Sequence, residues 1–405
     1  MTTIAINTTP PVIARRDRAA LVRAYLLLTP LVVFLALSFV GPIGTLLWQS
    51  VADEELSQAM PATAGALQEW DGVSDPPVML YKALAKDLGA VSPRDLAGAA
   101  RRLANEQPEL RAMLMTAKRK VSELDDTAEA FGRLDERWLA NPTWQTFKRA
   151  SGGVSTYHLL SAVGQKHDYR EGLVAKAEGS VYRDILGRTF LIAGATTVLC
   201  ALLAFPLCAF LQRQLPRTRN FMLLMVLLPF WTSILVRTTA WMVLLQDQGM
   251  VNSLLMNLGL IDSPMQLLYN RSGVLIAMVH VMLPFMIFPL LASMDAVNPL
   301  LSQAAYSMGA RPVRVFFQVY LPQVLPGLAA GALMVFIVTL GFYITPALLG
   351  GPGDQMISFY IAQFTTATLN WGLASALGVI LLVATTALYL VQARLARRSG
   401  QGNLK

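Results

Sequence analysis

The side chains that could carry out catalysis or hold a metal are few and widely spaced. The three histidines, His158, His167 and His280, lie too far apart along the chain to predict a metal site by their spacing. Cys200 and Cys208 lie in one apolar stretch and are typical of small packing residues. The sequence has no GxxxxGK[ST] pattern for nucleotide phosphates and no HExxH or GxSxG pattern for hydrolysis. We therefore expect no catalytic residue, no metal site and no cofactor bound by this chain.

The most informative spacing is that of the 295–322 segment, where apolar residues recur every three or four positions on both sides of a glycine. The two stripes are Leu301, Ala304, Ala305 and Met308, and then Val313, Phe316, Phe317 and Tyr320. This spacing predicts two short amphipathic helices. Gly309 lies between them, where a helix can end in a left-handed turn, and Pro312 suits the first turn of the second helix. The pair offers an apolar surface to a partner protein, to its own bundle or to the membrane interface.

The composition indicates that membrane-spanning helices position these residues. Of the 405 residues, 54% are hydrophobic and 14% are charged, which is more apolar than a soluble domain requires. Two cysteines cannot form a disulfide framework, and the apolar excess excludes a disordered chain. Six apolar stretches are long enough to cross a bilayer, namely residues 25–47, 190–211, 221–245, 273–294, 326–349 and 371–391.

The distribution of charge predicts how these spans are oriented. The segments before span 1 and after spans 2, 4 and 6 each carry a net excess of arginine and lysine. The three segments on the opposite side are all net negative. Because basic residues favour the cytoplasmic side, both termini of this multi-pass protein are predicted to be cytoplasmic. Topology thus explains the net charge of +8, and no nucleic-acid partner is needed.

The predicted domains follow from this topology. They are a cytoplasmic tail (1–24), a first transmembrane helix (25–50), an extracytoplasmic insert (51–182), a transmembrane domain (183–393) with a cytoplasmic loop (295–322), and a cytoplasmic tail (394–405). The insert holds most of the acidic residues, and windows such as 103–124 and 128–139 predict amphipathic helices. Asn141-Pro142 and Ser151-Gly152-Gly153 are expected to interrupt them. A spacer or lid, a docking surface and a ligand sensor are the roles that this mostly helical insert leaves open.

A few residues inside the spans are candidates for the substrate path. No aspartate or glutamate falls inside a predicted span, which disfavours an ion-coupled secondary transporter and indicates that another subunit supplies the energy. Arg237, in span 3, could bind a substrate carboxylate, satisfy backbone carbonyls at a helix break, or reach the membrane surface. Trp231 in span 3 and Tyr343 in span 5 could stack on a cationic substrate or simply pack. Thr345, also in span 5, is a further candidate for the substrate path. His280 in span 4 is typical of a hydrogen bond between packed helices.

The 295–322 segment resembles the EAA signature of ABC importer permeases, which reads Glu-Ala-Ala, three residues, Gly, nine residues, an aliphatic residue, one residue and Leu-Pro. The matching positions are Gln303, Ala304, Ala305, Gly309, Val319, Leu321 and Pro322. Gln303 replaces the glutamate, so this side chain keeps its hydrogen-bonding capacity and loses the charge. The resemblance implies that the segment docks into a groove of a nucleotide-binding subunit and transmits ATP-driven closure.

Other stretches within about residues 182–391 are similar to the spermidine/putrescine-type branch of these permeases. They are Pro229-Phe230-Trp231-Thr232-Ser233 with Val236-Arg237, Leu283-Pro284-Phe285, and residues 345–353. Asn370-Trp371-Gly372 departs from the branch's usual Asn-Trp-Pro, and the insert is longer than the usual link between spans 1 and 2.

The resemblance implies an all-α protein of the bacterial inner membrane with the six transmembrane helices of the type I ABC importer permease fold. It implies a subunit that hydrolyses nothing and pairs with a second permease or a copy of itself. Separate ATPase subunits would bind ATP and magnesium, and an extracytoplasmic solute-binding protein would deliver the substrate. Spermidine or putrescine is the implied substrate, but polyamines suggest acidic sites that these spans lack. A carboxylate-bearing amino-acid derivative or an opine-like solute therefore stays open as an alternative.

Overall fold

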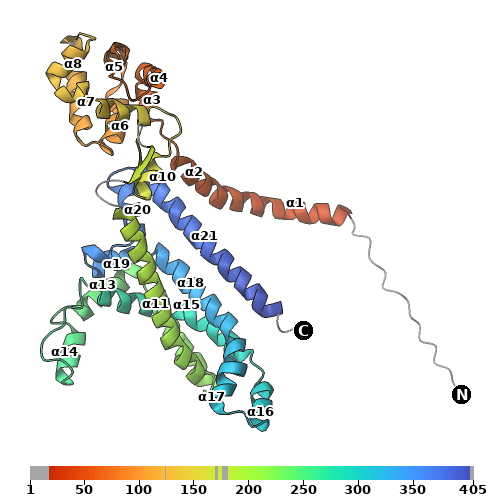
Figure 1. The fold of residues 1–405 in the computed structure, drawn as a ribbon. Helices are drawn as coiled ribbons and strands as arrows, with labels where there is room; N and C mark the ends of the chain where they lie inside the picture. Colours follow the sequence, from red (N-terminus) through yellow and green to blue (C-terminus); the bar gives the residue numbers. More distant parts are fainter. Residues whose placement is uncertain (1–17, 124, 169–171, 176–180, 402–405) are drawn as a thin grey trace. The chain divides into compact units, whose positions relative to one another are not determined.

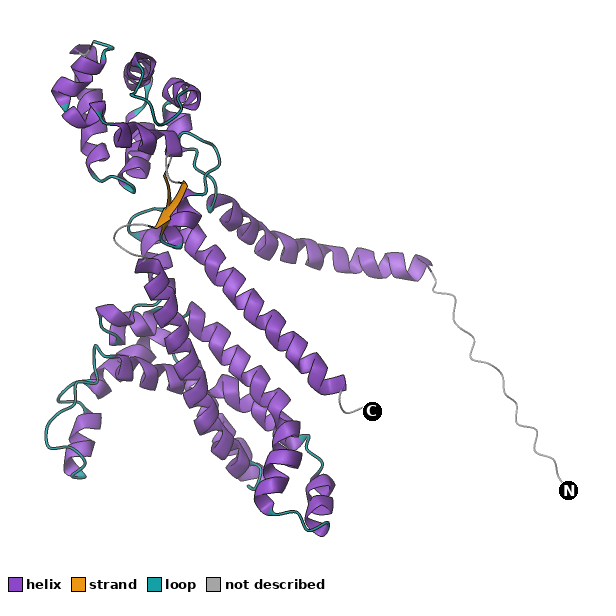
Figure 2. Cartoon of the chain, viewed as in Figure 1, coloured by secondary structure: helices purple, strands orange, loops and turns teal. Residues whose placement is uncertain are grey.

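The computed structural model describes residues 18–401, apart from residue 124 and residues 169–171 and 176–180 (Figure 1). Helices make up nearly all of the described chain (Figure 2). The chain divides into two units, Met1–Trp48 and Gln49–Lys405, which are described separately. Of the predicted cytoplasmic tails, residues 1–17 and 402–405 lie outside the described residues.

The first unit contains the first predicted span. It consists of α1 (Arg18–Leu35), a π-helical turn (Ala36–Val40) and the start of α2 (Gly41–Gln49). Residues Tyr25–Gln49 are long and apolar enough to cross a membrane, as predicted. The π turn comes directly before Pro42, where the missing proline N–H and the bulk of its ring disturb the regular hydrogen-bond ladder.

The insert forms a small helical domain around an aromatic core. Its helices are α3 (Glu55–Ala59), α4 (Pro61–Glu69), α5 (Val78–Ala90), α6 (Pro93–Ala104), α7 (Glu109–Lys120), α8 (Ala128–Leu134), α9 (Asn141–Ala150) and α10 (Tyr157–Ala162). The core rings are those of Tyr81, Phe131, Trp138, Trp144 and Phe147, all buried. A hairpin of β1 (Gln165–Asp168) and β2 (Gly172–Ala175) follows, which the sequence analysis did not predict.

Prolines and short caps divide the insert more finely than the periodicity predicted. The predicted helix 103–124 is two helices, because Pro108 caps the start of α7 and cannot sit inside a continuous helix. The predicted helix 128–139 ends at Leu134 and continues as a 3₁₀ turn. Pro142 occupies the first turn of α9, so Asn141-Pro142 begins a helix where an interruption was expected. The stretch Ser151-Gly152-Gly153 does follow the end of α9, as expected.

The transmembrane domain is a bundle in which α11, α15 and α18 pack against one another (Figure 1). Its helices are α11 (Val181–Leu211), α12 (Pro216–Leu227), α13 (Ile234–Leu245), α14 (Met250–Asn257), α15 (Arg271–Asp295), α16 (Pro299–Ser307), α17 (Pro312–Val315), α18 (Leu321–Gly341), α19 (Ile344–Leu349), α20 (Ile357–Thr366) and α21 (Trp371–Gln401). The thiols of Cys200 and Cys208 in α11 each lie 3.7 Å from a carbonyl oxygen of α15, which agrees with their predicted packing role.

Within the described residues, five helices are long and apolar enough to cross a membrane, and a bent pair of helices is a sixth span if the pair is counted as one. The bent pair is span 3, which was predicted as one helix over 221–245 and instead turns by 100°. Span 5 also differs from the predicted 326–349, because its helix runs over Pro312–Gly341 and α19 is a separate helix. The other four predicted spans correspond to long apolar helices.

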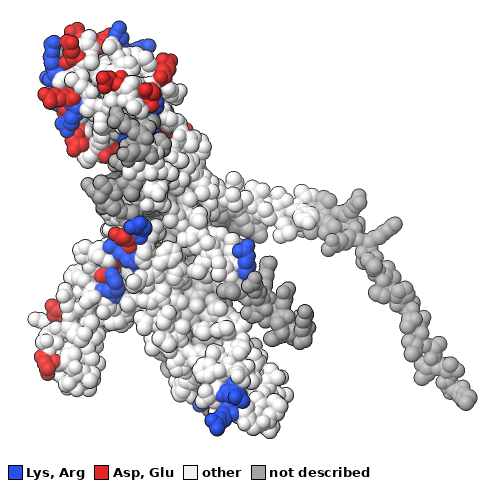
Figure 3. Space-filling model, in the orientation of Figure 1, with Lys and Arg blue, Asp and Glu red and all other residues white. Residues whose placement is uncertain are grey.

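Charged side chains gather away from the bundle (Figure 3). On the face shown, acidic and basic residues are mixed over the helices of the insert, whereas the surface of the long helices is almost uncharged. Basic side chains reappear at the opposite end of the bundle, near α16 and α17. This separation is the structural counterpart of the charge pattern from which the orientation was predicted.

Candidate functional site

The first candidate site is the 295–322 segment, whose first helix has a defined start and end. The side chain of Asn298 caps α16 by accepting the backbone N–H of Leu300 at 3.0 Å. At the other end, Gly309 has a φ of +83°, and the N–H of Ala310 donates to the carbonyl of Ala305 at 3.1 Å. This left-handed turn was predicted from the position of the glycine. A Cβ atom at Gly309 would meet nothing within 4 Å, so the constraint there is conformational and not one of space.

The segment buries two small anchors and exposes a set of large apolar side chains. Ala305 and Val315 are 6% and 2% exposed, so they hold the two halves of the segment against the protein. Gln303 and Ala304 are exposed. Large exposed apolar residues surround them, namely Leu300, Leu301, Tyr306, Met308, Val313 and Phe317. The predicted stripes are therefore divided: Ala305 faces inward, Phe316 and Tyr320 are partly buried, and Leu301, Ala304, Met308, Val313 and Phe317 are exposed.

The second predicted helix of the segment is not a separate helix. Residues 312–315 form α17, which passes through a π turn (Phe316–Tyr320) directly into α18. The π turn again precedes a proline, Pro322, which lies in the first turn of α18. Leu321 and Pro322 thus lie at the junction between the segment and a membrane-spanning helix. The second half of the segment and α18 therefore form one continuous helix.

A polar network that sequence reasoning missed joins both ends of the segment to α11 and α12. Asp295, the last residue of α15, forms an ion pair with Arg219 of α12 and accepts a hydrogen bond from Gln212 at 3.3 Å. The hydroxyl of Tyr320, at the end of the π turn, donates to the same glutamine side chain at 3.2 Å. Gln212 therefore contacts the residues on either side of the segment. The only sequence signal for this network was that Arg219 and Asp295, which are opposite in charge, lie in two loops predicted on the same side of the membrane.

The second candidate site is the break in span 3. A 3₁₀ turn (Leu228–Trp231) ends α12, the backbone is extended at Thr232, and α13 begins at Ile234. The guanidinium of Arg237 turns back over this break and donates to the carbonyl oxygens of Pro229 and Thr232, the latter at 3.1 Å. These contacts are the ones expected if Arg237 satisfies backbone carbonyls at a helix break, one of the three roles considered for it.

The other residues considered for the substrate path lie in different environments. Thr345 of α19 is 1% exposed, and its hydroxyl lies 3.2 Å from that of Thr238 in α13. Trp231 is 81% exposed and Tyr343 is 42% exposed, so both are open to lipid, substrate or a partner subunit. The structure thus brings Thr345 to the helix of Arg237 but leaves the two aromatic residues uncovered.

His280 and the candidate metal ligands need no special chemistry. The indole N–H of Trp241 in α13 donates to the Nδ1 of His280 in α15 at 3.2 Å, which is the helix-to-helix hydrogen bond predicted for this histidine. Among the described residues, no group of three histidine, cysteine, aspartate or glutamate side chains is placed to hold a metal ion.

A third feature, at the base of the insert, was not predicted. His158 of α10 is 4% exposed and its Nδ1 has no hydrogen-bond partner. Its ring lies on Gly372 at the start of α21, where a Cβ atom would come within 2.3 Å of the imidazole Nε2. Gly372 is the position at which the sequence departs from the polyamine-type pattern. The absence of a side chain at Gly372 leaves room for the ring of His158 from the insert.

This contact predicts a pH dependence of stability. Burial, and to a smaller extent the charge of Arg102, lowers the pKa of His158 to about 4, and the ring of Tyr157 packs beside it. Above about pH 7 the histidine is neutral in both the folded and the unfolded chain, so its contribution does not change. As the pH falls below about 6.5, the unfolded chain binds a proton that the folded chain does not, and the free energy of unfolding decreases.

We expect the wild type to lose about 2 kcal/mol more than His158→Gln between about pH 7.5 and about pH 5. The measurement is thermal unfolding of the purified protein followed by tryptophan fluorescence at both pH values. Because other groups also titrate, the difference between the two proteins is the result that counts. Equal pH dependence in wild type and variant would show that His158 is not held neutral by its surroundings.

Comparison with known proteins agrees with these features. The family model described as "Binding-protein-dependent transport system inner membrane component" matches residues 198–401. The chain is 31% identical to the spermidine/putrescine transport system permease protein PotB of Haemophilus influenzae over 214 residues, which is 53% of this chain and 75% of that protein. It is 29% identical to the PotB of Escherichia coli over 54% of this chain and 79% of that protein. A bacterial ABC transporter involved in alginate import is similar in structure, with a TM-score of 0.44 and 20% identity over 54% of this chain and 79% of that chain.

Proposed function

Because the chain belongs to the family of binding-protein-dependent transport system inner membrane components, we propose that it carries a small organic cation of the spermidine/putrescine class. The chain is a permease subunit of an ABC importer, a multi-pass protein of the inner membrane and not an enzyme. It works with the partners of such importers, including a binding protein and an ATPase. The observation that supports the substrate proposal is the similarity to two spermidine/putrescine permeases over three quarters of their length.

The position of Arg237 favours a cationic substrate over the carboxylate-bearing alternative. That alternative arose because the spans lack acidic residues, and Arg237 was its candidate carboxylate ligand; the guanidinium already donates to two backbone carbonyls. Asp354 is not a free acidic site either, because it is 7% exposed and accepts a hydrogen bond from Arg271 at 2.9 Å. We propose that a carboxylate that recognises the polyamine comes from Asp247, which is exposed, from a second permease or from the binding protein.

The 295–322 segment is the part that we assign to coupling. Its exposed residues Gln303 and Ala304, with the apolar side chains around them, would dock on an ATPase subunit that binds ATP and magnesium. Ala305 anchors the docking helix, Gly309 sets its end, and Leu321-Pro322 joins it to α18. A second permease, or a copy of this chain, would complete the translocation path in the lipid bilayer.

Uptake by the assembled importer tests the substrate proposal. The chain is co-expressed with an ATPase, a second permease and a binding protein, and uptake of labelled putrescine and spermidine is measured in cells and in proteoliposomes with ATP inside. We expect uptake that requires ATP and is competed by unlabelled polyamine but not by an opine-like amino-acid conjugate. Competition in the reverse order would reject the polyamine and restore the carboxylate-bearing solute.

The orientation and the domain division are part of the proposal and have a separate test. Reporter enzymes fused after Arg217, Arg314 and Arg398 are expected to report a cytoplasmic position, and one fused after Glu129 an extracytoplasmic position. The reason is the excess of basic residues in the segments after spans 2, 4 and 6, which contain the first three fusion points, and the net negative charge of the insert. A cytoplasmic signal from Glu129 would invert the arrangement and place the 295–322 segment out of reach of an ATPase.

A further inference from the structure

The part of the insert that contains α3 to α9 is tied together at its two ends. Residues 51–53 run beside residues 153–155, with Ala52 and Val154 paired as an antiparallel bridge. The N–H of Ser155 donates to the carbonyl of Val51 at 2.8 Å, and the N–H of Asp53 donates to the carbonyl of Gly153 at 3.2 Å. The insert is therefore held by one paired neck and not by two independent strands.

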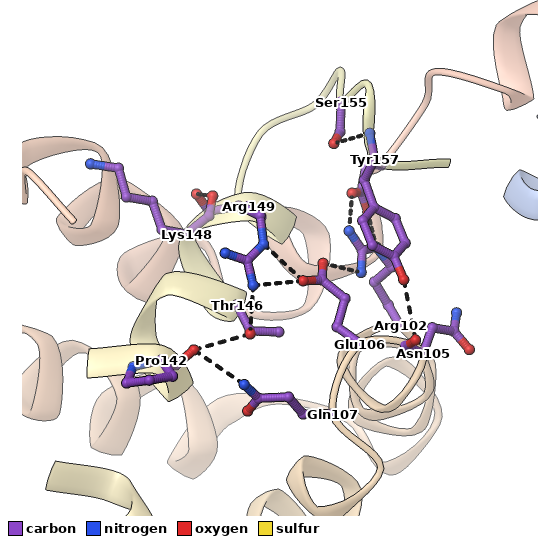
Figure 4. A network of polar contacts seen from close by, with 12 residues as sticks. Arg102, Asn105, Glu106, Gln107, Pro142, Thr146, Lys148, Arg149, Ser155 and Tyr157 are labelled. Carbon is purple, nitrogen blue, oxygen red and sulfur yellow. Dashed lines mark hydrogen bonds and ion pairs between the residues drawn. The ribbon is translucent and has the colours of Figure 1, made fainter. Parts of the chain in front are cut away.

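A buried ionic network locks this neck to the helices of the insert (Figure 4). The guanidinium of Arg102 is 2% exposed, donates to both carboxylate oxygens of Asp53 at 2.7 Å, and donates to Glu106 at 3.0 Å. Glu106 also accepts from Arg149 at 2.8 Å, and Arg102 lies 4.0 Å from the ring centre of Tyr157. Two guanidinium groups balance two carboxylates, and bidentate pairs of this kind fix geometry as well as charge.

The residue after this network makes the contact with the transmembrane domain. Tyr157 begins α10 beneath Arg102, and His158, the next residue, lies on Gly372 of α21. One turn further along α10, Ala162 is buried in a hydrophobic cluster that contains residues of α11, α20 and α21. The other buried members of this cluster are Ile185, Ile357, Leu373, Ala376 and Leu377. Within α10, no flexible linker separates the locked neck from these helices.

Resting on the transport function proposed above, we propose that the insert and the adjoining ends of α11, α20 and α21 move as one rigid body during transport, held in register by His158 on Gly372. His158 and Gly372 are positioning residues in this account. The insert then acts as a lever arm, because a displacement of the insert is passed directly to the ends of three transport helices. A spacer or lid that moves independently of those helices would not need a buried ring seated on a glycine.

Distance measurements between spin labels test the rigid body without relying on uptake. Cys200 and Cys208 are replaced by alanine, and labels are attached at two exposed positions, Glu129 in the insert and Thr368 between α20 and α21. We expect one narrow distance distribution with the same maximum in the purified chain, in the nucleotide-free importer and in the importer trapped with ATP. Gly372→Ala is expected to broaden it, because the new methyl group displaces the ring. A maximum that shifts between the two importer states would overturn the proposal.

A size-exchange series links the contact to transport. We expect Gly372→Ala to reduce uptake about fivefold with normal co-purification of the ATPase, and Gly187→Ala to leave uptake unchanged. Gly187 is the matched control because it is also helical and a Cβ atom there meets nothing within 4 Å. Removing the imidazole ring should make room for the new methyl group. The double variant His158→Ala with Gly372→Ala should therefore show the same uptake as His158→Ala alone. Equal uptake by both glycine variants would contradict the proposal, as would a double variant as impaired as Gly372→Ala.

Failure of this proposal differs from failure of the proposed function. If the wild-type chain shows no ATP-driven uptake with its partners, the proposed transport function is wrong. The width of the distance distribution in the purified chain still tests whether the insert and the helix ends form one rigid body. If uptake is normal and the distribution is broad in the wild type, the rigid body alone is wrong.

Discussion

Replacing Gly309 with valine is expected to reduce ATP-driven uptake about tenfold while the protein reaches the membrane in normal amounts. Gly309 has a φ of +83°, and a β-branched residue in this conformation costs about 1–3 kcal/mol of local strain. That strain is too small to unfold a six-span bundle. It is enough to move α16, which ends at this turn and carries the exposed Gln303 and Ala304. The measurement is co-purification of the ATPase with the permease, together with uptake in the same cells.

Two control variants separate conformation from chemistry in this test. Asparagine adopts the left-handed conformation more readily than valine, so Gly309→Asn should retain most of the uptake. Gln303→Glu should also be tolerated, because glutamate is the residue that related permeases carry there and Gln303 is exposed. Wild-type uptake and normal co-purification for Gly309→Val would mean that the 295–322 segment is not the coupling element.

The features predicted well from the sequence are those that depend on neighbours along the chain. The last span begins at Trp371 and the fourth ends at Asp295, within a residue or two of the predicted limits, because a long apolar run has an unambiguous helical solution in a membrane. The turn at Gly309 was also predictable, since a glycine between two helical stripes leaves few conformations.

The features that were missed depend on contacts between residues distant in sequence, or on helix breaks that do not lower the hydropathy of the span. Span 3 stays apolar through Pro229, Phe230 and Trp231, so hydropathy continued across a break that only the backbone geometry reveals. The contacts of Gln212 with Asp295 and of His158 with Gly372 join residues far apart in the chain. Periodicity carries no information about such pairs. The sequence shows both residues of each pair, but it does not show that they are in contact.

Among the substitutions considered, replacement of Arg237 should lower the amount of folded protein most. Arg237→Met removes the donor of the hydrogen bonds to the carbonyls of Pro229 and Thr232. Unsatisfied carbonyl groups at membrane depth cost several kcal/mol each. We therefore expect the amount of folded permease in the membrane to fall about tenfold or more, with a lower unfolding temperature for the remainder. Quantitative immunoblotting and thermal unfolding in detergent measure the two effects.

The kinetics of the surviving transporter distinguish a structural arginine from one that binds substrate. A role at the helix break predicts that uptake per folded molecule keeps its KM, and that Arg237→Lys recovers part of the membrane level because the ammonium group can still donate to a carbonyl. Arg217→Met is the matched control, since Arg217 is exposed and lies outside the break, and it should leave the membrane level nearly unchanged. A normal level of Arg237→Met combined with a raised KM would show that the guanidinium leaves the carbonyls to bind substrate. The carboxylate-bearing solute would then again be the better candidate.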